Sequence, residues 1–175
     1  MDRESIATVL SLYAIALDSH SWDLFDEIFT PEAQVEYPGG LRWHGLAAFK
    51  RDFTQRHEAA AGHQHLLASP YILIDGDRAF ALTYGRFNFF RASPAAGPSD
   101  MSEGGAWYDD ELVRLPHGWR VCKRSVGNFW WRGAMPEEGD VPRVVDSFPE
   151  WVRTGRVGYM NALREHLRSK KIPSR

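Results

Sequence analysis

From His63 onward, the sequence predicts long extended segments that are joined by tight turns. Four segments rich in strand-forming residues follow one another, at 63–74, 78–91, 104–115 and 119–132. Asp75-Gly76-Asp77 and Pro116-His117-Gly118 have the composition of tight turns, whereas 92–103, rich in Ala, Pro, Gly and Ser, is predicted to be a flexible loop. Strands joined in this way pair antiparallel, so the pattern predicts a four-stranded antiparallel meander.

The segment 78–91 is apolar on both faces. Phe80, Leu82 and Tyr84 alternate on one face, and Phe87 and Phe89 lie on the other. A strand that is apolar on both sides is normally covered on both sides. We expect helices on one face of the sheet and another subunit on the other.

The first part of the chain has helical periodicity. Its apolar stripe predicts a helix over about 3–18 and consists of Ile6, Val9, Leu10, Tyr13 and Leu17. Asp18 follows this stripe, at the joint with a second helix predicted over 21–29, which Thr30-Pro31 ends. Residues 34–37 and 41–44 are predicted to form a short hairpin, and 45–60 a third helix.

Helices that are separate from an antiparallel meander indicate an α+β fold. We expect a curved sheet with helices packed in its concave face, a cone that leaves a pocket at its wide end. Residues 1–132 form this domain. Residues 133–175 are a C-terminal extension with an extended segment up to 146 and one helix over about 156–169, packed over the pocket mouth or across a neighbouring subunit.

Composition narrows the class of protein. Hydrophobic residues make up 43% of the 175 residues and charged residues 25%, which is typical of a soluble globular domain. Seven Trp and 10 Phe favour an apolar cavity or a subunit interface, and a net charge of −2 without a basic stripe argues against nucleic-acid binding. The single cysteine, Cys122, fits a reducing compartment, and the expected location is cytoplasmic, with no signal peptide and no membrane span.

At this level of detail the chain resembles the SnoaL-like group of the nuclear transport factor 2-like superfamily, over residues 5–132. The residues that carry the resemblance are Ile6, Leu10, Tyr13, Leu17-Asp18, Trp22-Asp23, Phe29-Thr30-Pro31-Glu32-Ala33, Tyr37, Gly45, Phe49, His65, Asp75-Gly76-Asp77, Asp110, Leu112-Val113-Arg114 and Gly118-Trp119-Arg120-Val121. The resemblance implies the cone fold. It also implies a range of activities, among them dehydratases, ketosteroid isomerases, epoxide hydrolases, polyketide cyclases and members without a known reaction.

Two members of the superfamily suggest residue roles. Asp18, Tyr37 and His65 look like the catalytic Asp, a substrate-binding Tyr and the first catalytic His of scytalone dehydratase. The second catalytic His of that enzyme has no counterpart in 103–107, and its Tyr beside the Asp is replaced by Leu17. Compared with ketosteroid isomerase, Tyr13 matches the oxyanion-binding Tyr, while Tyr37 occupies the position of the general base.

Asp18 and His65 together could perform acid–base chemistry. A carboxylate bonded to one imidazole nitrogen raises the basicity of the other, which can then remove a proton alpha to a carbonyl. Tyr13 and Tyr37 could donate hydrogen bonds to the developing enolate oxygen. The alternatives are that Asp18 caps a helix, that His65 is a hydrogen-bonded strand residue, and that both tyrosines are structural.

The remaining candidate residues would line a ligand pocket or coordinate a metal, without taking part in the reaction. Trp43, Phe53, Trp107, Asn128 and Trp130 are candidate ligand-binding residues, with core packing as the alternative for the three aromatic residues Trp43, Phe53 and Trp107. Which residues at the end of the last strand point inward is open, because a bulge near Lys123-Arg124 would reset the alternation. The spacing of His63 and His65 also allows a metal site, with a third ligand from His44, His57 or Glu103, but we expect no metal.

Three functions remain open. The first is a cofactor-free dehydratase, isomerase or cyclase acting on a small hydrophobic cyclic or aromatic compound. The second is a binding module that holds such a compound without reacting, and the third is a dimerisation domain. We expect a homodimer or homotrimer, and neither nucleic acid nor a membrane as a partner.

Overall fold

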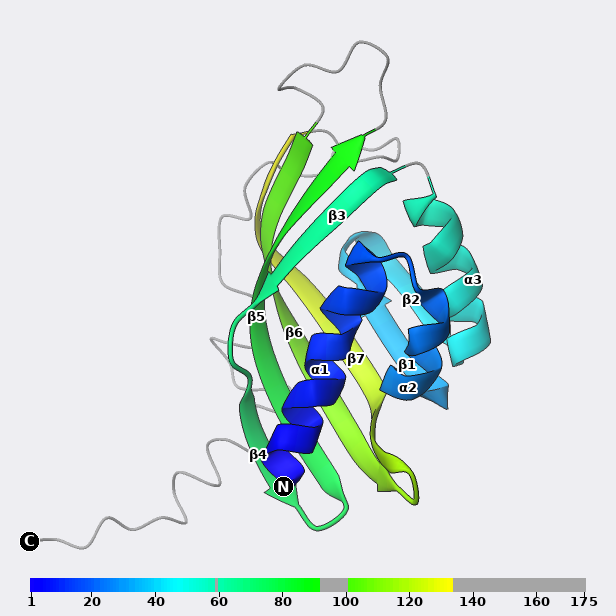
Figure 1. The fold of residues 1–175 in the computed structure, drawn as a ribbon, viewed down its shortest axis with the longest axis vertical. Coiled ribbons are helices and arrows are strands. Elements are labelled where there is room, and N and C mark those ends of the chain that lie inside the picture. The colour runs from blue at the N-terminus through cyan, green and yellow to red at the C-terminus, as the bar shows by residue number, and fades with distance from the viewer. Residues whose placement is uncertain (59, 92–100, 134–175) are drawn as a thin grey trace, which may run out of the picture.

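The computed structural model describes residues 1–58, 60–91 and 101–133, and Figure 1 shows the arrangement of their helices and strands. The elements in chain order are α1 (Asp2–Asp18), η1 (Trp22–Leu24), α2 (Phe25–Ile28), β1 (Phe29–Tyr37), η2 (Pro38–Gly40), β2 (Leu41–His44), α3 (Leu46–His57), β3 (Ala60–Leu67), β4 (Tyr71–Asp75), β5 (Arg78–Arg91), β6 (Met101–Leu115) and β7 (Gly118–Arg132). The predictions for 92–100 and for the extension beyond 133 lie outside the described residues.

All the strands belong to one curved sheet. Its order is β2-β1-β7-β6-β5-β3, and β4 also pairs with β5. The α+β prediction is confirmed, and so is the antiparallel meander, because β3, β4, β5, β6 and β7 pair antiparallel. The predicted hairpin of β1 and β2 is also present, and it extends the sheet because β1 pairs in parallel with β7.

Three predicted boundaries are wrong. The strand predicted from 63 begins at Ala60, but its predicted interruption at Pro70 is confirmed: β3 ends before this proline, which lacks a backbone N–H, and β4 follows it. The predicted loop 92–103 ends earlier, since β6 already begins at Met101. The helix expected over 21–29 is reduced to η1 and α2, and β1 starts at Phe29. Pro31 is tolerated in β1 because the register with β7 shifts between Phe29 and Gln34.

The helices cover the concave face of the sheet. In Figure 1, α1 crosses this face along its length, and α3 lies beside the β1–β2 hairpin. The stripe predicted for α1 is buried there, and α3 contributes Phe49 and Phe53 to the same core. Among the described helices, none is both long enough and apolar enough to cross a membrane.

Two register shifts in β7 decide which of its side chains face the helices. One lies opposite Glu111 and Leu112, and the other opposite Gly105 and Ala106. Each shift inserts one extra residue into β7, so the alternation of faces changes twice along the strand. Arg124, which follows the first shift, is consequently buried on the helix side, and Trp131, which follows both shifts, is buried there as well.

Candidate functional site

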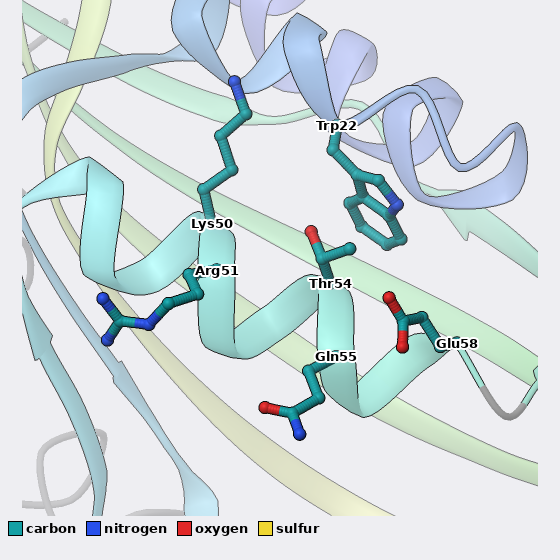
Figure 2. A pocket seen from close by; sticks show the side chains of 6 residues that line it. All are labelled: Trp22, Lys50, Arg51, Thr54, Gln55 and Glu58. Carbon is teal, nitrogen blue, oxygen red and sulfur yellow. The ribbon is translucent and has the colours of Figure 1, made fainter.

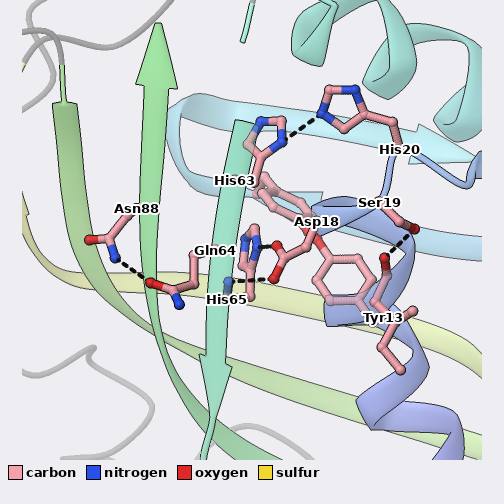
Figure 3. A network of polar contacts seen from close by, with 10 residues as sticks. Tyr13, Asp18, Ser19, His20, His63, Gln64, His65 and Asn88 are labelled. Atoms are coloured by element: carbon pink, nitrogen blue, oxygen red, sulfur yellow. Dashed lines mark hydrogen bonds and ion pairs between the residues drawn. The ribbon is translucent and has the colours of Figure 1, made fainter. Parts of the chain in front are cut away.

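The last turn of α1 meets the middle of β3 through Asp18 and His65. The Asp18 carboxylate accepts two hydrogen bonds from residue 65, one from ring Nδ1 at 2.7 Å and one from the backbone N–H at 2.9 Å (Figure 3). The His65 side chain is 4% exposed and that of Asp18 is 30% exposed. The pair therefore lies at the edge of the core, with the carboxylate nearer to solvent.

This geometry selects one tautomer of His65. A carboxylate can only accept, so Nδ1 carries the proton and Nε2 presents a lone pair. Burial raises the pKa of Asp18, but the hydrogen bonds from His65 outweigh it and hold that pKa below its usual value. Asp18 thus stays ionised at neutral pH and can accept both hydrogen bonds from residue 65.

A second contact joins the same two elements. Just beyond α1, Nε2 of His20 lies 2.9 Å from Nδ1 of His63, two residues before His65 on β3 (Figure 3). His63 is 8% exposed, and its Nε2 atom is buried with no hydrogen-bond partner among the described residues. Two imidazoles on one face of β3 are therefore each bonded to the end of α1.

Aromatic rings surround His63. Its ring centroid lies 5.0 Å from that of His57 and 4.8 Å from that of Phe89. Burial lowers the pKa of His57 to about 4 and that of His63 to about 3, so both rings are neutral at pH 7. No group of His, Cys, Asp and Glu within the described ranges has the geometry of a metal site.

Tyr13 and Tyr37 meet below the Asp18–His65 pair, where their hydroxyls are hydrogen-bonded to each other. Burial raises the pKa of both phenols well above the usual value, and the nearby Arg124 opposes this rise. The Arg124 guanidinium lies 4.2 Å from the Tyr13 ring centroid. Both tyrosines are consequently protonated and can act as hydrogen-bond donors.

Arg124 is held by a buried carboxylate. Its Nε and Nη2 donate to Asp110 at 2.7 and 2.9 Å, and the two residues are 1% and 0% exposed. Burial by itself lowers the pKa of Arg124, but the charge of Asp110 and its hydrogen bonds outweigh this effect and hold that pKa above its usual value. This ion pair forms the floor beneath the tyrosines.

Two of the predicted ligand-binding residues lie near this group. Phe53 packs against Tyr37 at 5.3 Å and against His57 at 4.1 Å between ring centroids. Trp43 is in contact with Tyr37 at 5.9 Å, and its indole N–H donates to Asp52 at 3.2 Å. Both are 7% exposed or less, so they belong to the core as well as to the surroundings of the tyrosines.

Two other candidates lie on the opposite face of the sheet. The ring of Trp107 covers Gly127, and the ring of Trp130 covers Gly105. Trp107 alternates with Tyr108, which contacts Tyr13 on the helix side, so the two side chains point in opposite directions. The expectation that Trp107 and Trp130 line the same cavity as Asp18 does not agree with this placement.

The register of β7 places Asn128 and Trp131 on the helix side. Asn128 is opposite the core residue Ala106, and Trp131 packs on Phe87 at 5.2 Å between ring centroids. Trp131 is thus the inward tryptophan at the end of this strand, in place of Trp130. Under strict alternation Asn128 and Trp130 would share one face, but the extra residue inserted between them opposite Gly105 and Ala106 puts them on opposite faces.

The described residues line surface hollows, of which two are the following. One, of about 520 Å³, lies on α3 beside Trp22 (Figure 2), and the other, of about 440 Å³, lies between β1, β6 and β7. Neither is lined by Asp18 or His65. The pocket expected over that pair therefore stays a prediction.

The sequence-based prediction missed His20 as a partner of His63, and it missed the Asp110–Arg124 pair. The i, i+2 spacing of His63 and His65 was a usable signal, because both side chains must share one face of a strand. His20 gave no local signal. Its role depends on how α1 docks against β3, some 40 residues later in the chain.

Comparison with known proteins identifies the family to which this chain belongs. A model of the SnoaL-like domain matches residues 1–125. The uncharacterized protein Rv2910c of Mycobacterium tuberculosis is 32% identical over 126 residues, which are 70% of this chain and 82% of that protein.

The solved structures that share the fold include the following two. A nuclear transport factor 2-like superfamily protein from Salmonella enterica has a TM-score of 0.64 at 18% identity, covering 79% of this chain and 96% of its own. A protein from Novosphingobium aromaticivorans, provisionally assigned as a scytalone dehydratase, has a TM-score of 0.69 at 13% identity, with coverage of 83% and 94%. At these identities the likeness is one of fold.

Proposed function

Since this chain belongs to the SnoaL-like domain family of the nuclear transport factor 2-like superfamily, we propose that it is an enzyme working by acid–base catalysis without a cofactor. Asp18 and His65 are its general base, and Tyr13 and Tyr37 stabilise the negative charge that develops on the substrate. The reaction class is dehydration, isomerisation or cyclisation of a small hydrophobic compound.

The observation that carries the proposal is the double hydrogen bond between Asp18 and residue 65. A helix cap at this joint would accept from backbone N–H groups in the first turn of the following helix, whereas Asp18 reaches 47 residues along the chain to an imidazole. The contact leaves the lone pair of His65 Nε2 available to accept a proton. A structural role alone does not require this orientation of the ring.

The tyrosines supply the hydrogen bond that stabilises negative charge on the substrate oxygen. The hydrogen bond between their hydroxyls uses one of the two phenolic protons, which leaves the other free for a substrate oxygen. The Arg124 charge below Tyr13 makes that phenol a better donor than it would be in an uncharged core. Proton removal by His65 and charge stabilisation by a phenol together produce an enolate.

The surroundings favour a flat, apolar substrate. Rings of Phe53, His57, Phe87, Phe89 and Trp131 line the helix side of the sheet near His63 and His65. Aromatic walls bind cyclic compounds through stacking and edge contacts. The dehydratase-like relative supports dehydration as one candidate reaction.

The test is proton exchange on a generic cyclic ketone. In D₂O, the protein is expected to accelerate the exchange of the acidic methylene protons of β-tetralone, measured by ¹H NMR. His65→Ala should lower the protein-dependent rate about 10²–10⁴-fold, and Asp18→Asn should also lower it. His44→Ala is the matched control, because His44 is exposed on β2. Full exchange rates in both site variants would rule out this mechanism.

A second candidate function is ligand binding without reaction. It is favoured by residues 103–107, which contain no counterpart of the second catalytic histidine of scytalone dehydratase. In this segment the Phe87 ring covers Gly104 and occupies the space of a side chain there. Tight binding of β-tetralone with no acceleration of exchange would support this alternative.

A further inference from the structure

Two side-chain pairs run in parallel from the end of α1 to β3. Asp18 bonds His65, and His20 bonds His63, and the ring centroids of the two β3 histidines are 6.3 Å apart (Figure 3). The proposed base is thus one member of a pair of neighbouring imidazoles. A single small molecule can contact both rings at this separation.

His63 has an unused hydrogen-bonding atom. Its Nδ1 is engaged by His20, while its buried Nε2 has no partner among the described residues. More than nine-tenths of buried polar groups find a partner, because leaving one without costs about 1–3 kcal/mol. An orphaned imidazole nitrogen beside a proposed catalytic base is most simply explained by a group that the site receives.

The backbone at His20 is held in an uncommon conformation. Among the described residues, His20 alone combines a non-glycine side chain with a positive φ, of 53°. This left-handed geometry lets the chain leave α1 while its imidazole points back at β3, and the ring stacks on Trp22 at 5.5 Å. A glycine would meet the turn at lower cost but would contact neither ring.

We propose that His63 donates a hydrogen bond from Nε2 to an oxygen atom of the molecule on which Asp18 and His65 act. His20 is its positioning residue. It donates from Nε2 to Nδ1 of His63, which places the single ring proton of His63 on Nε2. The inference rests on the proposed function and deepens it, because it requires a substrate with a carbonyl or hydroxyl oxygen near the carbon that loses its proton.

The electrostatics of His63 agree with this role. Burial and the neighbouring His57 and His65 keep its pKa low, so the ring stays uncharged near pH 7. A neutral imidazole has one N–H, and the partner of the other nitrogen decides which atom carries it. A neutral ring can polarise an oxygen without attracting the proton that His65 removes.

The first test needs no ligand. Long-range ¹H–¹⁵N NMR of the full-length protein reports the tautomer of each histidine. His63 is expected in the Nε2–H form. The Nδ1–H form would overturn the proposal, because Nε2 would then have no proton to donate. In His20→Phe the preference for Nε2–H should be lost, while His20→Gln, whose side-chain amide can also donate, should retain it.

The second test uses bound β-tetralone and its carbonyl stretching frequency. The frequency falls when the oxygen accepts a hydrogen bond, so it should be lower in the wild-type protein than in His63→Phe. His20→Phe should give a smaller shift than the wild type, and His44→Phe should match the wild type. Equal frequencies in the wild type and His63→Phe, or no binding of the ketone, would overturn the proposal.

The two proposals fail in different ways. The carbonyl shift that His63→Phe removes is measured without turnover, whereas the exchange assay compares the wild type with Asp18→Asn while His63 is present in both. A retained carbonyl shift without proton exchange would refute the proposed enzyme and leave the oxygen-binding role of His63 standing.

Discussion

Asp18 shows how one side chain can link a helix end to a strand. Its two carboxylate oxygens hold both the ring and the backbone of residue 65, so the orientation of the imidazole is set twice. The resemblance to scytalone dehydratase predicted the two residues, and the structure places them within hydrogen-bond distance. Their catalytic role remains a proposal.

The buried histidines should make stability depend on pH. The pKa values of His57 and His63 are lowered to about 4 and about 3 in the folded chain, from an ordinary 6.5. Between pH 6.5 and these values the unfolded chain binds more protons, so this contribution to stability is complete above pH 6.5 and is lost as the pH falls.

We therefore expect the urea midpoint to decrease from pH 7 to pH 4. Each buried histidine adds at most about 1.4 kcal/mol per pH unit to the slope of unfolding free energy against pH. His57→Phe should flatten this slope, and the exposed-site variant His44→Phe should not. An unchanged slope in His57→Phe would contradict the assigned environment.

At the scale of elements, β6 and β7 are joined by a buried charge pair as well as by their ladder. Asp110 and Arg124 lie side by side across the two strands, beneath α1. A charge taken out of water is tolerated only beside its counter-charge. The pair therefore ties the floor of the proposed site to a single register of the strands.

Replacing only one residue of the Asp110–Arg124 pair should lower the unfolding free energy strongly, whereas replacing both should not. Asp110→Asn leaves the Arg124 charge uncompensated and is expected to lower the unfolding free energy by about 3–5 kcal/mol in urea denaturation. The double variant Asp110→Leu, Arg124→Met should be at least as stable as the wild type if the cavity repacks. A mild effect of Asp110→Asn would show that the charge is not buried as described.

At the scale of the whole molecule, the sheet face away from the helices carries exposed apolar side chains. Tyr84 is 47% exposed and stacks on Phe129 at 5.4 Å. Further exposed residues on this face are Phe90 on β5, Leu66 on β3 and Met101 on β6. Exposed apolar side chains gathered on one sheet face are typical of a subunit interface, which fits the expected homodimer or homotrimer.

We predict that light scattering after size-exclusion chromatography will give a mass above the 20.0 kDa of one chain. Tyr84→Arg should shift this mass toward the monomer, because a charge in the patch opposes association. Ile15→Arg is the control, since Ile15 is equally exposed but lies on α1. A monomeric wild type would refute the prediction.

The sequence by itself determined the kinds of elements and most of their order. The apolar stripe of α1 and the bounds of β5 follow from short-range periodicity, which every residue records locally. The parallel pairing of β1 with β7 does not, because no local pattern states which distant strand supplies the partner. The opposite faces of Asn128 and Trp130 depend likewise on a bulge whose register only the neighbouring strand defines.

The candidate site also contains residues that the sequence predicted and residues that only the tertiary structure brings together. Residue type and spacing pointed to Asp18, His65, Tyr13 and Tyr37, since each stands in a recognisable pattern. His20 enters only through the docking of α1 on β3, where a left-handed residue turns a surface imidazole toward a buried one. Contacts between segments more than 40 residues apart are decided by packing of the whole core, and that information is not present in any one stretch of sequence.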